Sequence, residues 1–404
     1  MHVPVWHEAT KELWKRGKIQ VLGILEEQHP DRTRLFMQWK QMDWPLMVDS
    51  LNLLGMPAVP VTLCIDEYGI IRLVNPPAND AGRLEEIFLS KTYQKRAGAA
   101  PNVAAVPDLA RTKATAASGT TADLRAYGDA LFLWGGADRL SEAIEVYQRA
   151  VQLEAGDGDT HFHLGVALRK RYDSVERHAG DFQRAVDEWK AALDTDPNQY
   201  IWRRRIQQYG PRLDKPYSFY DWVLTARDDI RKRGETPVPL AVEPGGAEFA
   251  EPSKAEEVSV AQYEAPDPKG RIVRDTGKLI TVETAIVPPT KSTGSAVRVH
   301  VEFRPNASLN AHWNNESGPL ALWVDPPPGW QTNANYFSLR NPPEPVSLEP
   351  RRLDFELKPP DGLKSGVFPV PAYALYYVCE DVNGVCLYRR QDIELAVKLG
   401  KAKK

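Results

Sequence analysis

The sequence predicts a multidomain protein with an α/β unit first, an all-α unit second and an all-β unit last. Helical and strand patterns alternate at the front, helical patterns alone fill the middle, and strands of alternating apolar and polar residues fill the end. At 404 residues the chain is also too long for one ordinary hydrophobic core. We therefore expect an α/β domain at 1–95, a linker at 96–120, a helical domain at 121–232, a Pro-rich linker at 233–268 and a β domain at 269–404.

The composition excludes several classes of function. Lys and Arg number 51 against 54 Asp and Glu, with no long block of one sign, so nothing indicates a nucleic-acid partner. No run approaches the 18 or more apolar residues of a membrane helix, and we expect no membrane span. The residues after Met1 lack a basic and an apolar region, so no signal peptide is expected in the chain as given. We expect neither a cofactor nor a metal site.

The first unit alternates helices and strands. Apolar Val5, Trp6, Ala9 and Leu13 recur at helical spacing, and the segment after them is rich in Ile, Val and Leu. We expect helices over 4–16, 32–42 and 80–92 and strands over 19–25, 45–49, 61–66 and 70–74.

The segment Val59-Pro60-Val61-Thr62, before the strand Leu63–Asp66, resembles the cis-proline segment of thioredoxin-like proteins. Trp44–Asp49 resembles the extracytoplasmic thiol reductase branch of that family and its peroxiredoxin neighbours. The resemblance implies a cis bond before Pro60, and backbone at Val59, Pro60 and Val61 that binds an extended thiol substrate. It also favours an extracytoplasmic, periplasmic site in a bacterium.

In this family a proline follows the second cysteine of the CxxC motif by about five residues, and Pro4 fits that position. The resemblance thus implies an incomplete thioredoxin-like domain whose first strand and cysteine pair would precede Met1. Our hypothesis is that the product starts upstream and that a selenocysteine codon was read as a stop, which would make it a selenoprotein. Cys64, between Leu63 and Ile65 in a strand, is expected to be a small buried hydrophobe and not the nucleophile.

Two helical hairpins of the second unit match each other. Ala143, Tyr147 and Ala150 recur as Ala185, Trp189 and Ala192, 42 residues later. Leu164-Gly165, the polar insertion Arg171–Gly180 and a capping helix over 198–209 complete a pattern that resembles the tetratricopeptide family. That resemblance implies a protein partner bound by the helical repeats. The Ala-, Thr- and Pro-rich residues before them have the composition of a linker.

The third unit contains several expected strands, with alternation such as Val297, Val299, Val301 and Phe303. They predict an antiparallel sandwich, with strands at 279–287, 296–303, 320–324, 353–357, 373–379 and 385–397. The segment Tyr376–Leu387 resembles the cysteine hairpin of the amino-terminal domain of DsbD, an immunoglobulin-like sandwich that passes electrons to thioredoxin-fold partners. This resemblance implies that Cys379 and Cys386 are a redox pair and that a thioredoxin-fold protein is a partner. The alternative is that they are two structural thiols.

The geometry of that hairpin leaves three registers open. A two-residue turn at Asn383-Gly384, the simplest choice, pairs Cys379 with Tyr388 and leaves the cysteines diagonal and too far apart for an easy disulfide. A turn at Val382-Asn383 places them opposite each other, and a three-residue loop puts them on opposite faces. Glu380 and Asp381 are expected to raise the pKa of a nearby thiol.

Three further groups of residues are interpreted as structural. His161 and His163 are two apart on a helix and do not face each other, so we expect solvated or packed histidines. Arg203-Arg204-Arg205 is expected to spread round a helix as a solvated face. His312-Trp313-Asn314-Asn315 is expected to be a loop that packs one Trp, and the alternative is that it lines a ligand surface.

The sequence thus predicts a thiol–disulfide redox protein, with Cys379 and Cys386 as the catalytic candidates in the chain as given. The alternative is a non-catalytic protein-interaction scaffold with a degenerate thioredoxin-like domain.

Overall fold

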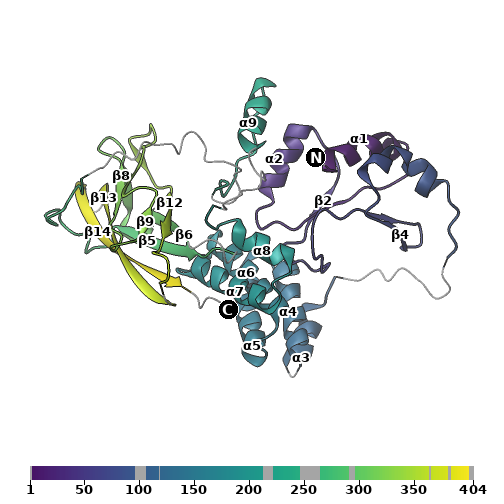
Figure 1. Ribbon diagram of the computed structural model, residues 1–404, viewed down its shortest axis with the longest axis horizontal. Helices are drawn as coiled ribbons and strands as arrows, with labels where there is room; N and C mark the ends of the chain where they lie inside the picture. The colour runs from purple at the N-terminus through teal and green to yellow at the C-terminus, as the bar shows by residue number, and fades with distance from the viewer. Residues whose placement is uncertain are drawn as a thin grey trace. The chain divides into compact units, whose positions relative to one another are not determined.

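The computed structural model describes residues 2–95, 106–117, 119–212, 222–245, 264–290, 296–363, 365–380 and 384–399 (Figure 1). The described residues fall into two compact units. The first lies within 1–177, 187–205 and 220–243, and the second within 178–186, 206–219 and 244–404. Together they contain many helices and a carboxyl-terminal region of antiparallel sheets, so the prediction of a mixed helical and β multidomain chain is confirmed at that level. No helix in the described ranges could cross a membrane.

The first 95 residues form an α/β arrangement in the order that the sequence predicts. Its elements are α1 (His2–Lys15), β1 (Gly23–Leu25), α2 (Asp31–Lys40), β2 (Leu46–Val48), β3 (Leu63–Ile65), β4 (Ile71–Val74), the 3₁₀ helix η1 (Ala78–Arg83) and the π-helix η2 (Glu85–Leu89). β1 and β2 pair in parallel, whereas β3 and β4 form an antiparallel hairpin. The helix expected over 80–92 is therefore replaced by two short segments of other helix types.

Helix α1 buries one face, because Trp6 and Leu13 are two turns apart and both lie in a small core. Gly17, with φ of 66°, follows the helix, and the next residue donates its N–H to the Leu13 carbonyl. The same core includes these buried residues: Met42, Trp44, Cys64, Leu84 and Phe88.

The middle of the chain is helical: α3 (Leu109–Ala117), α4 (Thr121–Trp134), the 3₁₀ turn η3 (Ala137–Arg139), α5 (Leu140–Leu153), α6 (Gly158–Tyr172), α7 (Asp181–Thr195), α8 (Tyr200–Gln207) and α9 (Trp222–Lys232). The positions that recur in the sequence are the fully buried ones, Ala143, Tyr147 and Ala150 in α5 and Ala185, Trp189 and Ala192 in α7. The repeat thus marks the buried face of each helix.

Part of the predicted linker over 96–120 is ordered. Residues 96–105 and 118 lie outside the described residues, but Leu109–Ala117 forms α3. The Asp108 carboxylate accepts hydrogen bonds from two N–H groups of the first turn, and Ala116 is 4% exposed. Composition missed the helix because alanine is the best helix former and can pack without a large side chain.

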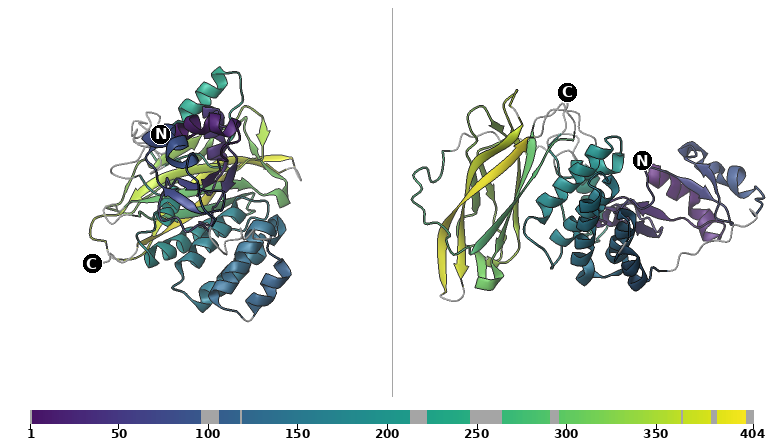
Figure 2. Two further views of the ribbon diagram at one scale, coloured as in Figure 1. Left: turned by 90° about the vertical axis from the view of Figure 1, so that its right-hand side faces the viewer. Right: turned by 90° about the horizontal axis from the view of Figure 1, so that it is seen from below.

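The second unit contains two antiparallel sheets that share one core (Figure 2). One sheet has the order β5 (Ile280–Val287), β6 (Val297–Pro305), β12 (Arg351–Lys358), β9 (Gln331–Thr332). The other has the order β10 (Tyr336–Leu339), β8 (Leu320–Val324), β13 (Gly366–Glu380), β7 (Ala311–Asn314), β11 (Val346–Ser347), with β14 (Val385–Leu399) paired along β13. We call the side of this second sheet that faces away from the shared core its outer face.

Candidate functional site

The cysteine hairpin consists of β13 and β14, which pair over the whole of both strands. On β13, Val370, Ala374, Tyr376 and Val378 belong to the shared core. The residues between them therefore lie on the outer face, because successive strand residues point to opposite sides. Cys379 is one of these outer-face residues.

Cys379 and Cys386 lie directly opposite each other and form a disulfide, with their Cα atoms 4.0 Å apart. Of the three registers, this is the one expected for a turn at Val382-Asn383, and the simplest register, with Cys379 opposite Tyr388, is wrong. Residues 381–383 themselves lie outside the described residues. The core face of the two strands excludes the three-residue loop, since a slip by one residue would expose that face. The register favoured by Asn383-Gly384 differs from the observed one by two residues and keeps both faces, so the disulfide is the feature that distinguishes them.

The two sulfur-bearing residues differ in their access to solvent. Cys379 is 4% exposed, whereas Cys386, on the outer strand, is exposed. Glu380 pairs with Ala311 of the core, so it lies on the opposite face of the sheet from Cys379. Its charge is therefore directed away from the disulfide, contrary to the sequence-based expectation that it would act on the thiol.

A third strand extends this row of residues. β7 pairs with β13 on the side away from β14, and His312 is the register partner of Cys379. Cys386, Cys379 and His312 thus form one row across three strands on the outer face. This arrangement could not be predicted from the sequence because β7 is only four residues long, and its neighbours Asn310 and Asn315 are typical of turns.

Trp313 holds β7 in place. Its side chain is fully buried, its indole N–H donates to the Glu349 carbonyl at 2.9 Å, and the Arg351 guanidinium lies 4.3 Å from the ring centroid. The expected loop around one packed Trp is therefore a strand, with Trp313 in the core and His312 on the outer face.

Aromatic side chains flank the disulfide. Tyr377 and Tyr388 are register partners two residues from the cysteines, and their rings stack with centroids 4.4 Å apart. Tyr388 is 38% exposed, so this stack gives the disulfide an apolar, accessible neighbour on the outer face.

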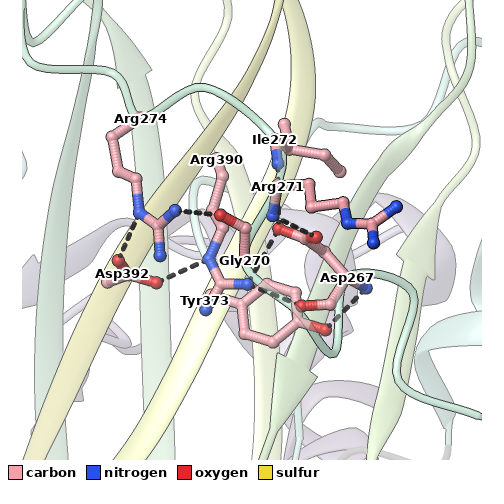
Figure 3. A network of polar contacts seen from close by, with 8 residues as sticks. All are labelled: Asp267, Gly270, Arg271, Ile272, Arg274, Tyr373, Arg390 and Asp392. Atoms are coloured by element: carbon pink, nitrogen blue, oxygen red, sulfur yellow. Dashed lines mark hydrogen bonds and ion pairs between the residues drawn. The ribbon is translucent and has the colours of Figure 1, made fainter.

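Farther along the same face, a cluster of charged side chains fastens the segment before β5 to the hairpin (Figure 3). Arg390 of β14 donates to the Asp267 carboxylate at 2.9 Å and to Asp392 at 2.6 Å, and lies over the Tyr373 ring. Although burial raises it, the net pKa of Asp267 is lowered, because Arg390 and two backbone N–H groups donate to its carboxylate. We call Asp267, Tyr373, Arg390 and Asp392 the clasp.

The predicted substrate segment lies in the first unit. The Val59–Pro60 bond is cis, as the resemblance implied, and both residues are exposed while Val61 is half-buried. Cys64 is 8% exposed within the small core, and burial raises the pKa of its thiol, so the expectation of a packed hydrophobe is confirmed. Of the three cysteines in the sequence, it alone is free.

A buried polar cluster that the sequence analysis missed also lies in the first unit. Arg205 is 2% exposed, so its interpretation as part of a solvated face is wrong. Its guanidinium donates to the Gln28 side chain and to the carbonyls of Glu26 and Ser50, and lies over the Phe162 ring. Burial and then the charge of Asp49 raise the pKa of Glu26 to about 7, against a lowering effect of Arg205.

His161 and His163 are both packed. His161 Nδ1 lies 2.6 Å from Glu188 Oε2 and its Nε2 lies 3.1 Å from the Ala155 carbonyl. The hydrogen bond to Glu188 is the main cause of a raised pKa for His161. His163 instead pairs with Asp129, so the two rings have separate partners. Within the described ranges, no group of three or more potential ligand side chains could hold a metal ion.

Comparisons with known proteins identify no family. No protein-family model matches the sequence, and no curated protein matches it. Among solved structures, the GAE domain of GGA2p from Saccharomyces cerevisiae is similar over 32% of this chain and 97% of that chain, at 10% identity and a TM-score of 0.17. A score this low supports no conclusion about fold or function.

Proposed function

We propose that the protein exchanges thiols and disulfides with a thioredoxin-fold partner and that Cys379–Cys386 is its reactive disulfide. The observation that carries this proposal is the asymmetry of the bond, with an exposed Cys386 and a nearly buried Cys379 on the outer face. A disulfide that only braced the hairpin would need no accessible sulfur. Here an incoming thiolate has one sulfur within reach.

The exchange would proceed in two displacements. The partner thiolate attacks Cys386 Sγ, the bond between Cys386 and Cys379 breaks, and Cys379 leaves with the electron pair and takes up a proton. The partner's second thiol then loses its proton and attacks the partner sulfur of the mixed disulfide, and Cys386 leaves and is protonated. The partner dithiol gives up two electrons and two protons, and both are gained by the cysteine pair.

The finer fold assignments belong to the same proposal. The order of α1, β1, α2, β2 and the β3–β4 hairpin is compatible with a thioredoxin-like domain, in which Val59, Pro60 and Val61 would contact a thiol substrate. The matching buried faces of α5 and α7 support tetratricopeptide-type repeats. Two antiparallel sheets round one core, with the cysteine hairpin, support an immunoglobulin-like domain related to the amino-terminal domain of DsbD. A disulfide of this kind favours an oxidising, extracytoplasmic compartment.

A protein-interaction scaffold is the second candidate, and one feature of the helices favours it. A pocket of about 220 Å³ lies against α3, α4 and α5 and is lined by both acidic and basic side chains, among them Lys113, Glu142 and Arg149. Hydrogen bonds from Tyr127, then Arg139 and Lys113 lower the pKa of Glu142 to about 2. Such a charged recess could hold a polar side chain of a bound peptide.

A trapping experiment separates the two candidates. The full chain carrying Cys379→Ser keeps the exposed Cys386, so it should form a mixed disulfide with an oxidised thioredoxin. The Cys386→Ser chain, whose remaining thiol is nearly buried, should react at least tenfold more slowly. Cys64→Ser is the matched control and should behave like the unchanged chain.

The wild-type disulfide should also equilibrate with glutathione at a potential above about −300 mV, the region below which structural disulfides lie. A pair that stays oxidised down to that potential, with no mixed disulfide in either variant, would refute the redox proposal and leave the scaffold.

A further inference from the structure

We propose that His312 is the proton donor for the Cys379 sulfur when the disulfide opens, and that its imidazolium stabilises the Cys379 thiolate. This role rests on the proposed function for its place in the reaction. Its effect on the Cys379 thiol is a property of the reduced chain and can be measured whether or not a partner protein reacts.

The strand register places His312 beside Cys379. The two residues are directly opposed on β7 and β13, so their side chains share the outer face with Cβ atoms about 5 Å apart. Cys386 occupies the corresponding position on the other side of Cys379. Cys379 therefore lies between Cys386, from which its sulfur separates when the disulfide opens, and the imidazole of His312, which can protonate that sulfur.

Solvent access favours the same assignment. Cys379 is 4% exposed, so the departing sulfur has little water from which to take a proton, whereas His312 is half-buried and retains contact with solvent. An imidazole in this position can pass a proton from solvent to the sulfur. The electron pair of the broken bond then becomes the S–H bond of Cys379, and the imidazole recovers its proton from water.

The charges near Cys379 also point to His312. On the outer face its described neighbours include His312 and Asn314 of β7, Tyr377 of its own strand, and Cys386 and Tyr388 of β14. Burial raises the pKa of the Tyr388 hydroxyl. Arg390, farther along β14, is already paired with Asp267 and Asp392.

Burial disfavours a thiolate, and a nearby cation opposes that effect. Of the described side chains next to Cys379 on this face, the imidazole of His312 is the group that can become cationic.

Contacts of β7 with the core hold His312 in register with Cys379. Trp313 is anchored in the core by Glu349 and Arg351, and Asn315 donates its backbone N–H to the Pro345 carbonyl at 2.9 Å. Because Trp313 within β7 and Asn315 just after it are both held in this way, His312 cannot change register without moving a buried Trp.

The test uses the full chain with Cys64→Ser and Cys386→Ser, so that Cys379 is the single thiol. The rate of alkylation by iodoacetamide against pH gives the thiol pKa. We expect His312→Asn to raise the pKa of the Cys379 thiol, with a loss of thiolate of about threefold at pH 7. His312→Lys should restore the lower value by charge alone. Tyr388→Phe, which alters the neighbour on the other strand, should leave it unchanged.

The second readout is reduction of the intact disulfide by dithiothreitol in the full chain. After correction for the thiolate fraction of the reductant, the wild-type rate should fall as rising pH removes the proton from the imidazole. His312→Asn should remove that step. Folding of each variant is checked by near-ultraviolet circular dichroism.

Unchanged alkylation and reduction profiles in a folded His312→Asn chain would overturn the assignment. A shifted thiol pKa together with failure of the thioredoxin trap would refute the proposed function and leave the effect of His312 intact.

Discussion

Replacing Arg205 by Met tests whether one buried guanidinium holds together the polar cluster of the first unit. Methionine keeps much of the length and apolar contact of arginine but donates no hydrogen bond. In the variant the carbonyls of Glu26 and Ser50 lose the hydrogen bonds that they accept from Arg205, whose side chain is 2% exposed. Both hydrogen bonds are only partly buried, so each carbonyl left without its donor costs about 1 kcal/mol, the low end for a buried acceptor, and the two together cost roughly 2 kcal/mol.

The expected readout is local, because a chain of several units does not unfold in one step. Hydrogen–deuterium exchange with mass spectrometry would follow peptides that cover 22–30 and 46–54. A loss of roughly 2 kcal/mol predicts about a thirtyfold loss of protection there, since each 1.4 kcal/mol is a factor of ten.

Arg203→Met is the matched control, because Arg203 is only half-buried and bonds the Pro197 carbonyl at the surface. It should change protection less than threefold, as surface substitutions usually do. Protection in Arg205→Met within threefold of the wild type would show that the cluster is not held by this side chain, and would refute the reasoning.

Three further predictions follow from titration and from chain topology. Because the pKa of Glu26 is raised to about 7 in the folded chain, its contribution to stability falls as pH rises from about 4.5 to 7. Glu26→Gln should therefore make the melting temperature depend less on pH over that interval. The pKa of His161 is also raised in the folded chain, so its contribution to stability likewise falls as pH rises. That contribution is complete below the unfolded pKa near 6.5 and is lost as pH rises through the folded pKa. His161→Asn should therefore lower the melting temperature at pH 6 more than at pH 9. Reducing the disulfide, which spans a sequence separation of 7, should cost about 2.5 kcal/mol in chain entropy, measured as a fall in the urea midpoint with dithiothreitol and absent in Cys386→Ser.

Much of the element order was predictable because it depends on periodicity. The alternation of Val297, Val299, Val301 and Phe303 is the core face of β6, and the repeated Ala-aromatic-Ala positions are the buried face of α5 and α7. Such patterns indicate burial directly, because the hydrophobic effect determines which face of a strand or helix packs into the core.

The candidate site was only partly predictable. The sequence indicated the cysteine hairpin but left three registers open. The core face excludes only the register that is shifted by one residue, and the turn dipeptide Asn383-Gly384 favours a register shifted by two that keeps both faces. His312 could not be assigned, since its role depends on a short strand that pairs across a sequence separation of more than sixty residues. Arg205 was assigned to solvent because a run of three arginines carries no information about which one a neighbouring loop will cover.

The long core face of β13 and β14 has a consequence for any redox cycle at its tip. Residues such as Tyr376, Val378 and Val397 hold the two strands in register by burial, and the clasp binds them again from the outer side. Opening the sulfur–sulfur bond therefore leaves the sheet as it was. A partner would meet nearly the same surface before and after the reaction, and could distinguish the two states only by the sulfur atoms and the protonation of their neighbours. The hairpin would then accept and donate electrons without a change in its backbone conformation that could report its redox state.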